Sequence, residues 1–590
     1  MSFKLVESQR EYLSHEQGYY IYPLGSRNRM ALVYPNLYKV GMSNLGFHII
    51  YDIMNRRTDT ACERFFLPEK KLIKEYERTN TPIMSIETQS YLCDFPLIAF
   101  DISFEIDYFN VLDIMELSRV TLKAAERKEN DPIVIAGGPC STFNPEPLSP
   151  FIDAFIIGEG ENTMMYFMDV LYDSKTKKIS RADTLKALSK IDGVYVPSLY
   201  SVEYKSDGII KSIELRDKIS KKFVDNSERD ITSAKADIFP KIKRQWIENI
   251  DDYPAHTVVV TSDTEFNMYL IETARGCGRH CRFCMAGYCY RRPRNRSLEE
   301  LKKCIAEAKK FNKRIGLMGA AISDYPQIDE LCDYIIDEGM KMSVASFRAD
   351  SVSEKLVRAL KKSGTRTLTL APEAGNDKMR AVINKGIDEK HLFHAMDIGM
   401  AAGIHHYRLY IMIGLPFETF EDIESICELA VRIKEYIGKK GALTLSVNPF
   451  IPKPFTPFQW LPMENKKNIE KKYKMIHDLL KNEKSIELLT EPLRSSYVQG
   501  VLARGDRRVG EALHEAHKNG GAKGFRTALK SVGLDEDFYL YRERGEDEIM
   551  PWDILDMHVK REYLISELEK AKKGQSTMRC FDNCHRCGVC

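Results

Sequence analysis

The sequence lacks a strong charge of either sign, because 87 Lys and Arg residues nearly balance 85 Asp and Glu residues and leave a net charge of +2. Such a balance gives no general reason to expect nucleic acid or an anionic membrane as a partner. Long apolar runs are missing too. A stretch such as residues 132–136 (PIVIA) has the length of a strand and falls far short of the roughly 18 residues that a membrane-spanning helix needs.

The first seven residues, MSFKLVE, lack the apolar core and the cleavage site of a secretory signal, which predicts a cytoplasmic protein with reduced thiols. No internal repeat of fixed period is apparent. The composition is otherwise that of a globular chain, and 590 residues predict several domains. Fourteen Cys in a reducing compartment favour metal or redox roles over a disulfide framework, and they cluster twice.

The chain divides into four predicted regions. Strand-length apolar runs alternate with amphipathic helical stretches in residues 1–180, which predicts a doubly wound, Rossmann-like α/β domain. Residues 181–254 contain an alternating pattern around Ser206-Asp207-Gly208, typical of a β-hairpin, and then a polar linker. A second series of six strand and helix patterns in 255–464 predicts a partial (β/α)6 barrel. Residues 465–590 predict a helical region with a Cys-rich tail.

The first cysteine cluster is Cys277, Cys281 and Cys284, spaced as CxxxCxxC directly after the first predicted barrel strand. Thiolates hold iron-sulfur clusters, and a four-iron cube with three protein ligands keeps one iron open for another molecule. Gly276 would let the loop wrap closely around such a group. A zinc site or a closed iron-sulfur site is the alternative, with Cys289 as a further ligand.

With Phe283 in its aromatic position, this loop resembles the CxxxCxΦC motif of the radical S-adenosylmethionine (radical SAM) enzymes. The resemblance implies a 4Fe-4S cluster whose open iron binds S-adenosylmethionine (SAM). It also implies reductive cleavage to a 5'-deoxyadenosyl radical and a reductant such as flavodoxin or ferredoxin. Phe283 is then expected beside the adenine.

Further family elements follow in order along the barrel. The resemblance implies SAM contacts after successive strands, where the acid usual beside Gly319 and Ala320 is missing and Ser323 or Asp324 could replace it. The other implied cofactor-binding residues are Arg348, Glu373 and Gly414. The proline-rich segment 447–460 resembles a last-strand element of the family and could line the substrate mouth or simply close the barrel.

Residues 132–161 resemble the end of the cobalamin-binding domain that precedes the barrel in a large radical SAM subgroup. The resemblance implies that Gly137 and Gly138 face a corrin, since glycine permits close backbone approach. The DxHxxG loop that supplies a cobalt ligand is absent, and the domain's histidines, His15 and His48, lie in other contexts. The alternative is a domain kept as a scaffold without cobalamin.

The second cluster is Cys580, Cys584, Cys587 and Cys590, four thiols in eleven residues. Four thiolates can close a zinc site or a 4Fe-4S cluster without help from the rest of the chain, so we expect a second Fe-S cluster or zinc at the tail.

Residues 288–296 (YCYRRPRNR) interleave Tyr and Arg and suggest an RNA-facing lip, although these Arg residues could instead balance cluster thiolates, meet SAM or form an ordinary surface. The favoured function is radical SAM chemistry, with cobalamin-dependent methyl or methylthio transfer to an unactivated carbon of RNA, protein or a small molecule. The alternative is an RNA-binding metalloprotein scaffold with structural Fe-S or zinc sites.

Overall fold

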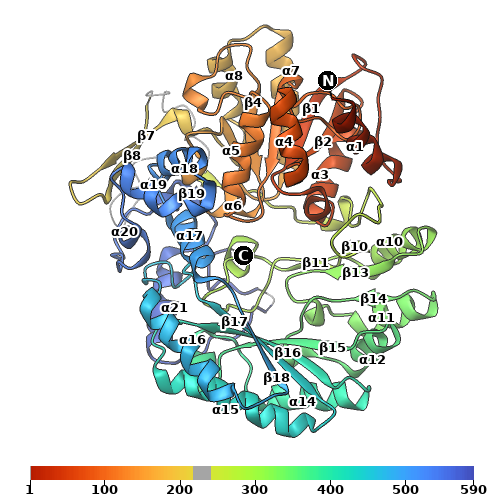
Figure 1. Ribbon diagram of the computed structural model, residues 1–590, viewed down its shortest axis with the longest axis vertical. Coiled ribbons are helices and arrows are strands. Elements are labelled where there is room, and N and C mark those ends of the chain that lie inside the picture. The colour runs from red at the N-terminus through yellow and green to blue at the C-terminus, as the bar shows by residue number, and fades with distance from the viewer. Residues whose placement is uncertain (1, 217–240, 582, 590) are drawn as a thin grey trace.

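A computed structural model describes residues 2–216, 241–581 and 583–589. Figure 1 shows the amino-terminal α/β domain at one end of the molecule and the partial barrel at the other. The predicted α/β class is confirmed. Among the helices of the described residues, none combines the length and the apolar character that crossing a bilayer requires.

The amino-terminal sheet has the strand order β2-β1-β3-β4-β5-β6 and is parallel except for its last strand. Its strands are β1 (Asn28–Tyr34), β2 (Thr60–Phe66), β3 (Leu97–Asp101), β4 (Ile133–Gly137), β5 (Ala154–Ile156) and β6 (Val194–Tyr195). The order reverses between β1 and β3, and open parallel sheets bind ligands at the carboxyl edge beside such a point. Since β6 belongs to this sheet, the domain continues beyond the predicted boundary at residue 180.

Both faces of this sheet are buried, as expected for a parallel sheet. Met30 and Leu32 of β1 pack toward helices α3 (Leu45–Arg56) and α7 (Gly160–Thr176). Ala31 and Val33 point to the opposite side, which is covered by α5 (Asp107–Leu117) and by α18 (Val509–Lys518) from the far end of the chain.

The predicted hairpin is present as the antiparallel strands β7 (Tyr200–Tyr204) and β8 (Ile210–Leu215). Gly208 between them has φ +86°, a conformation that favours glycine. Most of the predicted linker, residues 217–240, lies outside the described residues.

The barrel consists of two parallel sheets joined by one parallel bridge between Phe347 and Leu370. Its strands are β10 (Met268–Glu272), β13 (Arg314–Met318), β14 (Met342–Ser343), β15 (Thr367–Glu373), β16 (His406–Ile413), β17 (Ala442–Pro449) and β18 (Ile486–Thr490). The six predicted strands are all there, but the chain is not wholly helical after residue 464. The seventh strand, β18, pairs with β17. It is mostly exposed at the edge of the sheet, and its short sequence, IELLT, carries little apolar pattern.

Helices alternate with the barrel strands and cover them from outside. They are α10 (Leu298–Lys310), α11 (Ile328–Asp337), α12 (Glu354–Lys362), α14 (Glu389–Ala401), α15 (Phe420–Ile437) and α16 (Lys466–Leu480). Their apolar residues and those of the strands form one continuous core.

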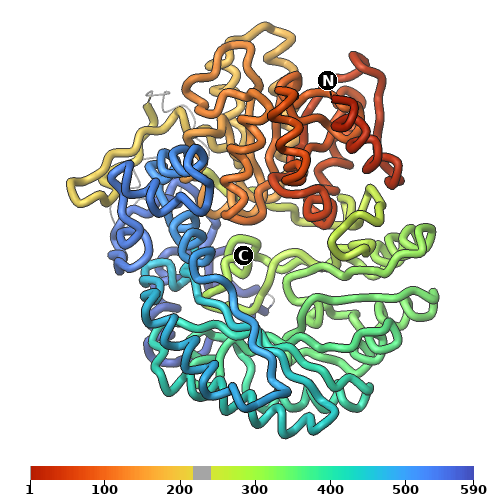
Figure 2. Tube along the Cα trace, in the orientation of Figure 1, coloured from red at the N-terminus to blue at the C-terminus, as the bar shows by residue number. Residues whose placement is uncertain are grey.

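The carboxyl-terminal region connects the two halves of the molecule. In Figure 2 its blue trace runs alongside both the amino-terminal domain and the barrel. Most of the proline-rich segment 447–460 packs in the core that α18 shares with the amino-terminal sheet, where Phe458 and Trp460 are almost completely buried. Helix α21 (Arg561–Lys572) packs on α13 (Asp377–Val382) of the barrel and leads into the Cys-rich tail.

Candidate functional site

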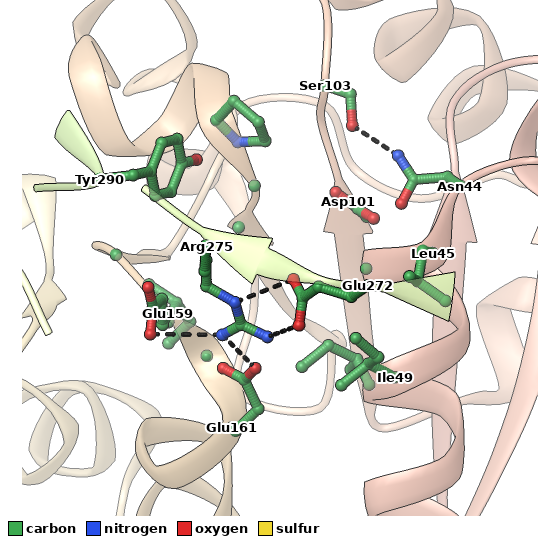
Figure 3. Close-up of a pocket in the computed structure, with 18 of the residues that line it drawn as sticks. Asn44, Leu45, Ile49, Asp101, Ser103, Glu159, Glu161, Glu272, Arg275 and Tyr290 are labelled. Atoms are coloured by element: carbon green, nitrogen blue, oxygen red, sulfur yellow. Dashed lines mark hydrogen bonds and ion pairs between the residues drawn. The ribbon is translucent and has the colours of Figure 1, made fainter. Parts of the chain in front are cut away.

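A cavity of about 460 Å³ lies between the carboxyl edge of the amino-terminal sheet and the first barrel strands (Figure 3). The amino-terminal domain contributes lining residues from α3 and from the ends of β3, β4 and β5, and the barrel contributes residues from the ends of β10 and β13. They include Asn44, Asp101, Gly137, Gly138, Gly276, Gly319 and Ala320. The predicted residues Gly137 and Gly138 are thus brought together with Gly319 and Ala320. The volume is in the range of small-molecule and cofactor pockets.

Asp101 ends β3 and lines this cavity at the point where the strand order reverses. Burial raises the pKa of its carboxyl group to about 7. No hydrogen bond to this carboxyl group is present within the described part of the chain, although nearby Asn44 Nδ2 donates to Ser103 Oγ at 3.0 Å. A buried carboxyl group without a partner is costly, and it suits a ligand that brings its own hydrogen-bond donor.

Gly137 and Gly138 are adjacent, but a side chain at each position would have a different effect. A Cβ on Gly137 would approach nothing closer than Ile156 Cβ, at 3.9 Å, so the absence of a side chain there leaves space. Gly138 has φ +91°, and a Cβ on it would lie 2.6 Å from Asp101 Oδ1. Gly138 is therefore required by the protein's own packing, whereas Gly137 opens the cavity.

An ion-pair network crosses the cavity wall and joins the two domains. Arg275 of β11 (Ala274–Arg275) pairs with Glu161 at 2.7 Å, with Glu272 at 2.9 Å and with Glu159 at 3.2 Å (Figure 3). Burial opposes the ionisation of Glu272, but the guanidinium groups of Arg275 and Arg296 outweigh it and keep its pKa below the ordinary value. Arg275 and Glu272 were not predicted from the sequence, where the one available signal is an arginine directly before the thiol loop.

The thiol loop starts at Gly276, whose φ is +80°. A Cβ there would lie 2.1 Å from the carbonyl oxygen of Tyr290, so the loop can pass close to the following segment only with glycine. The loop brings Cys277, Cys281 and Cys284 near one another. Burial, and next the charge of Cys281, raises the pKa of Cys277 and that of Cys284, the latter to about 12.

Within the described residues, no three His, Cys, Asp or Glu side chains already surround a single point where one metal ion could bind. A four-iron cube places each thiolate on a different iron, so its ligands are farther apart than those of one ion. Cys289, the alternative ligand, is completely buried in α9 (Ala286–Cys289), and burial raises its pKa to about 12.

The predicted SAM-binding residues that follow the second and third barrel strands have partners within the protein. Arg348 Nη1 is 3.8 Å from Cys281 Sγ, and Arg348 Nε donates to Asp350 at 3.1 Å. Asp324 is held by Arg279, with Nε donating at 2.7 Å. Ser323, the other candidate for the missing acid, shares a hydrogen bond of 2.8 Å with Ser351.

Glu373 ends β15 with φ +67° and pairs with Lys385 at 2.9 Å. The Lys385 ammonium group lies 5.8 Å from the ring centre of Phe283, so these two predicted residues share one neighbour. Gly414 does not line the cavity. A Cβ on it would lie 2.6 Å from Ile469 of α16, which explains the glycine by helix packing.

The tail lies directly against the thiol loop. The backbone N–H of Cys580 donates to the carbonyl oxygen of Gly278 at 2.8 Å, and Cys580 Sγ lies 3.1 Å from His280 Nε2. Cys584 and Cys587 are buried, and Cys590 lies outside the described residues. The sequence analysis treated the two clusters as separate, because nothing in the sequence shows that residues 300 positions apart are in contact.

The suggested RNA-facing lip at residues 288–296 is wrong. Tyr288, Arg291 and Arg296 are at most 1% exposed, and Arg294 is 7% exposed. Arg294 pairs with Glu159 at 2.6 Å and Arg296 with Glu272 at 2.7 Å. These arginines are internal partners of carboxylates, so they cannot form a surface for phosphates.

Comparison with known proteins agrees with this architecture. The family model "Radical SAM proteins, N-terminal" matches residues 46–197, and "Radical SAM superfamily" matches residues 271–430. The uncharacterized protein MJ0966 of Methanocaldococcus jannaschii is 31% identical over 488 residues, which cover 82% of this chain and 90% of that protein. The uncharacterized methyltransferase PH0819 of Pyrococcus horikoshii is 26% identical over 322 residues, or 53% of this chain and 60% of that one.

Among solved structures, the cobalamin-dependent S-adenosylmethionine radical enzyme OxsB with aqua-cobalamin bound is similar at a TM-score of 0.43 and 15% identity. The similarity covers 68% of this chain and about half, 52%, of that one. The thiol loop at the first barrel strand, the order of the domains and the match to MJ0966 along most of both chains lead to one conclusion. The chain is an enzyme of the radical SAM superfamily.

Proposed function

We propose that this enzyme cleaves SAM at the thiol loop and uses cobalamin, bound in the cavity, to transfer a methyl group to an unactivated carbon. The shared cavity carries this proposal. Its walls come from the carboxyl edge of the amino-terminal sheet and from the barrel strands that lead into the thiol loop. A cofactor held by the first domain would therefore face the reaction site of the second.

On the barrel side, Cys277, Cys281 and Cys284 would hold a 4Fe-4S cluster, which when bound supplies the electron that breaks a carbon-sulfur bond of SAM. Arg348, next to Cys281, would meet the carboxylate of SAM. Glu373 and Phe283 lie around Lys385 and would border the nucleoside.

On the other side of the cavity, the residues suit a large ligand that carries amide groups. Gly137 leaves space for close approach, and the unpartnered carboxyl group of Asp101 can accept a hydrogen bond from an amide N–H. Of the described residues that line the cavity, none is histidine. His48 is buried, with Nε2 on the carbonyl oxygen of Met42 and Nδ1 on the N–H of Val259, so we expect cobalt to have no ligand from a histidine.

Methyl transfer is favoured over the other outcomes by the similarity to PH0819, an uncharacterized methyltransferase. Methylthio transfer and the identity of the methyl acceptor belong to the same proposal, with RNA, protein and small molecules as candidate acceptors.

The test is anaerobic reconstitution with iron, sulfide and cobalamin, followed by reduction in the presence of SAM labelled in its methyl group. We expect 5'-deoxyadenosine, and a paramagnetic Co(II) spectrum without nitrogen coupling. The variant with Cys277, Cys281 and Cys284 all replaced by Ala should bind cobalamin as the wild type does and form no 5'-deoxyadenosine. Failure of the wild type to bind cobalamin would overturn the cofactor assignment, and failure to cleave SAM under every reductant would leave the scaffold alternative.

A further inference from the structure

The tail residue Cys580 makes two hydrogen bonds to the thiol loop, one to Gly278 and one to His280. Its backbone N–H donates to the carbonyl oxygen of Gly278, the residue after Cys277, at 2.8 Å. Its Sγ lies 3.1 Å from Nε2 of His280, the residue before Cys281. Cys580 is therefore hydrogen-bonded to the direct sequence neighbours of two loop thiols, Cys277 and Cys281.

The direction of the bond between His280 and Cys580 follows from the groups on the other ring nitrogen. Arg291 Nη1 lies 2.9 Å from His280 Nδ1, and a guanidinium group can only donate. Nδ1 therefore accepts, so the proton of the neutral ring is on Nε2 and is donated to Cys580 Sγ. His280 is completely buried, which protects this N–H···S bond from water. Hydrogen bonds to sulfur are among the means by which proteins set the reduction potential of iron-sulfur clusters.

The other described tail thiols are also held close to the protein. Cys584 is 2% exposed and Cys587 is 1% exposed, and the N–H of Lys560, just before α21, donates to the carbonyl oxygen of Cys587 at 2.9 Å. Arg586 Nε donates to Cys584 Sγ at 3.2 Å. Buried thiols on a short irregular tail are the arrangement that a bound metal group orders.

We propose that Cys580, Cys584 and Cys587 hold an iron-sulfur cluster that passes single electrons from a carrier protein to the loop cluster. The proposal rests on the proposed function, since radical SAM cleavage consumes one electron in each event. The carrier is oxidised by one electron, the tail cluster gains and then loses that electron, and the loop cluster is reduced. No proton or covalent bond is exchanged in this transfer.

The surface around Cys580 indicates the kind of carrier. Met578 is 77% exposed and Phe581 is 59% exposed, so two large apolar side chains flank the thiol. Positive charge is also available there, since Lys573 and Arg579 are exposed, whereas Lys570 and Lys572 are paired with Glu567 and Glu569 of α21. Charge complementarity and a small apolar contact fit an acidic one-electron carrier such as a ferredoxin or flavodoxin.

The first test measures the metal itself. Reconstituted full-length protein should bind about eight irons, and the variants lacking either the three loop thiols or Cys580, Cys584 and Cys587 should each bind about four. The Cys93→Ala variant, which removes a thiol far from both clusters, should bind as many as the wild type. The loop variant should show a reducible tail signal by electron paramagnetic resonance. One zinc per chain in that variant, with no iron, would overturn the proposal.

The second test follows electron transfer. In rapid-freeze experiments, reduced ferredoxin should reduce the loop cluster at least tenfold more slowly when Cys580 and Cys587 are replaced by Ala, while a strong small-molecule reductant should reduce it as in the wild type. Equal rates with ferredoxin would overturn the proposal. Because this measurement needs neither cobalamin nor a methyl acceptor, its failure is distinct from failure of the proposed function.

His280 supplies the third test as a positioning residue. His280→Leu removes the N–H···S donor and should move the midpoint potential of the tail cluster to more negative values, because that donor stabilises the reduced, more negative cluster. His280→Gln, which retains an N–H donor, should recover most of the shift. If the Leu variant folds, binds about eight irons and keeps the wild-type potential, the assigned role of His280 is wrong.

Discussion

Arg282 and Glu567 form an ion pair with 3.1 Å between Nη2 and Oε2, and both side chains are 0% exposed. Arg282 belongs to the thiol loop, between Cys281 and Phe283, whereas Glu567 belongs to α21. Arg282 also donates to the carbonyl oxygens of Val382 and Gln575 at 2.8 and 2.6 Å. The loop is therefore anchored to the barrel and to the carboxyl-terminal helix by a single buried cation.

Replacing Glu567 by Ala should lower the free energy of unfolding by about 3 kcal/mol, because the Arg282 charge would remain buried without its carboxylate. The first urea transition, followed by tryptophan fluorescence, measures this change. Glu569→Ala is the matched control on the same helix, since Glu569 pairs with Lys572 at the surface and its removal should have little effect. Equal effects of the two substitutions would contradict the anchoring role.

Replacing Arg275 by Gln should destabilise the contact between the domains by about 2 kcal/mol at pH 7, because Glu161 loses its guanidinium partner. Glu159 and Glu272 have pKa values below the ordinary 4.5, since arginine partners outweigh burial. Their contribution is complete above that value and disappears as the pH falls through the lowered values. The difference in unfolding between variant and wild type should thus shrink below pH 4.5. Arg292→Gln, at an exposed pair with Glu248, should show little difference at either pH.

Asp101 predicts the opposite dependence on pH. Burial raises its pKa from 3.8 to about 7, so the folded state holds a proton that the unfolded state releases, and stability falls as the pH rises from about 4 to 7. Asp101→Asn should remove this loss and stabilise the cofactor-free protein by about 4 kcal/mol at pH 8, with no gain at pH 4. Thermal unfolding at both pH values checks this. The exposed Asp94→Asn change should have no such effect, and a gain for Asp101→Asn that is equal at both pH values would refute the argument.

Substitutions at Gly137 and Gly138 should affect ligand binding and folding separately. Gly137→Val should weaken cobalamin binding at least tenfold and change the free energy of unfolding by less than about 1 kcal/mol, because its Cβ points into open space. Gly138→Ala should instead cost more than about 1 kcal/mol, because φ is +91° and Asp101 is 2.6 Å from the new atom. Equilibrium titration with cobalamin and thermal unfolding of the cofactor-free proteins provide the two readouts.

The sequence predicted the features that local pattern determines. The apolar runs correspond to β3, β4 and the first six barrel strands. Strands that are buried on both faces consist of nearly continuous apolar residues, so they can be recognised in the sequence. The spacing of Cys277, Cys281 and Cys284 predicted the loop that the structure brings together. β18 was missed because an edge strand buries too little surface to impose a pattern on its five residues.

Contacts between distant residues could not be predicted in the same way. Glu161 meets Arg275 across 114 positions, and His280 meets Cys580 across 300. The charge and polarity of these residues are common on protein surfaces, so a single sequence does not distinguish a buried partner from a solvated side chain. Arg291, Arg294 and Arg296 were misassigned for this reason.

The thiol loop is synthesised well before the tail that covers it. The thiol loop leaves the ribosome about 300 residues before Cys580, so the loop's rear face stays uncovered while the remaining half of the chain is made. During that interval no part of the tail can contact the loop that carries Cys277, Cys281 and Cys284. Docking of the tail then closes the loop, so a chain terminated early by a nonsense mutation would leave this face of its cluster open to oxygen.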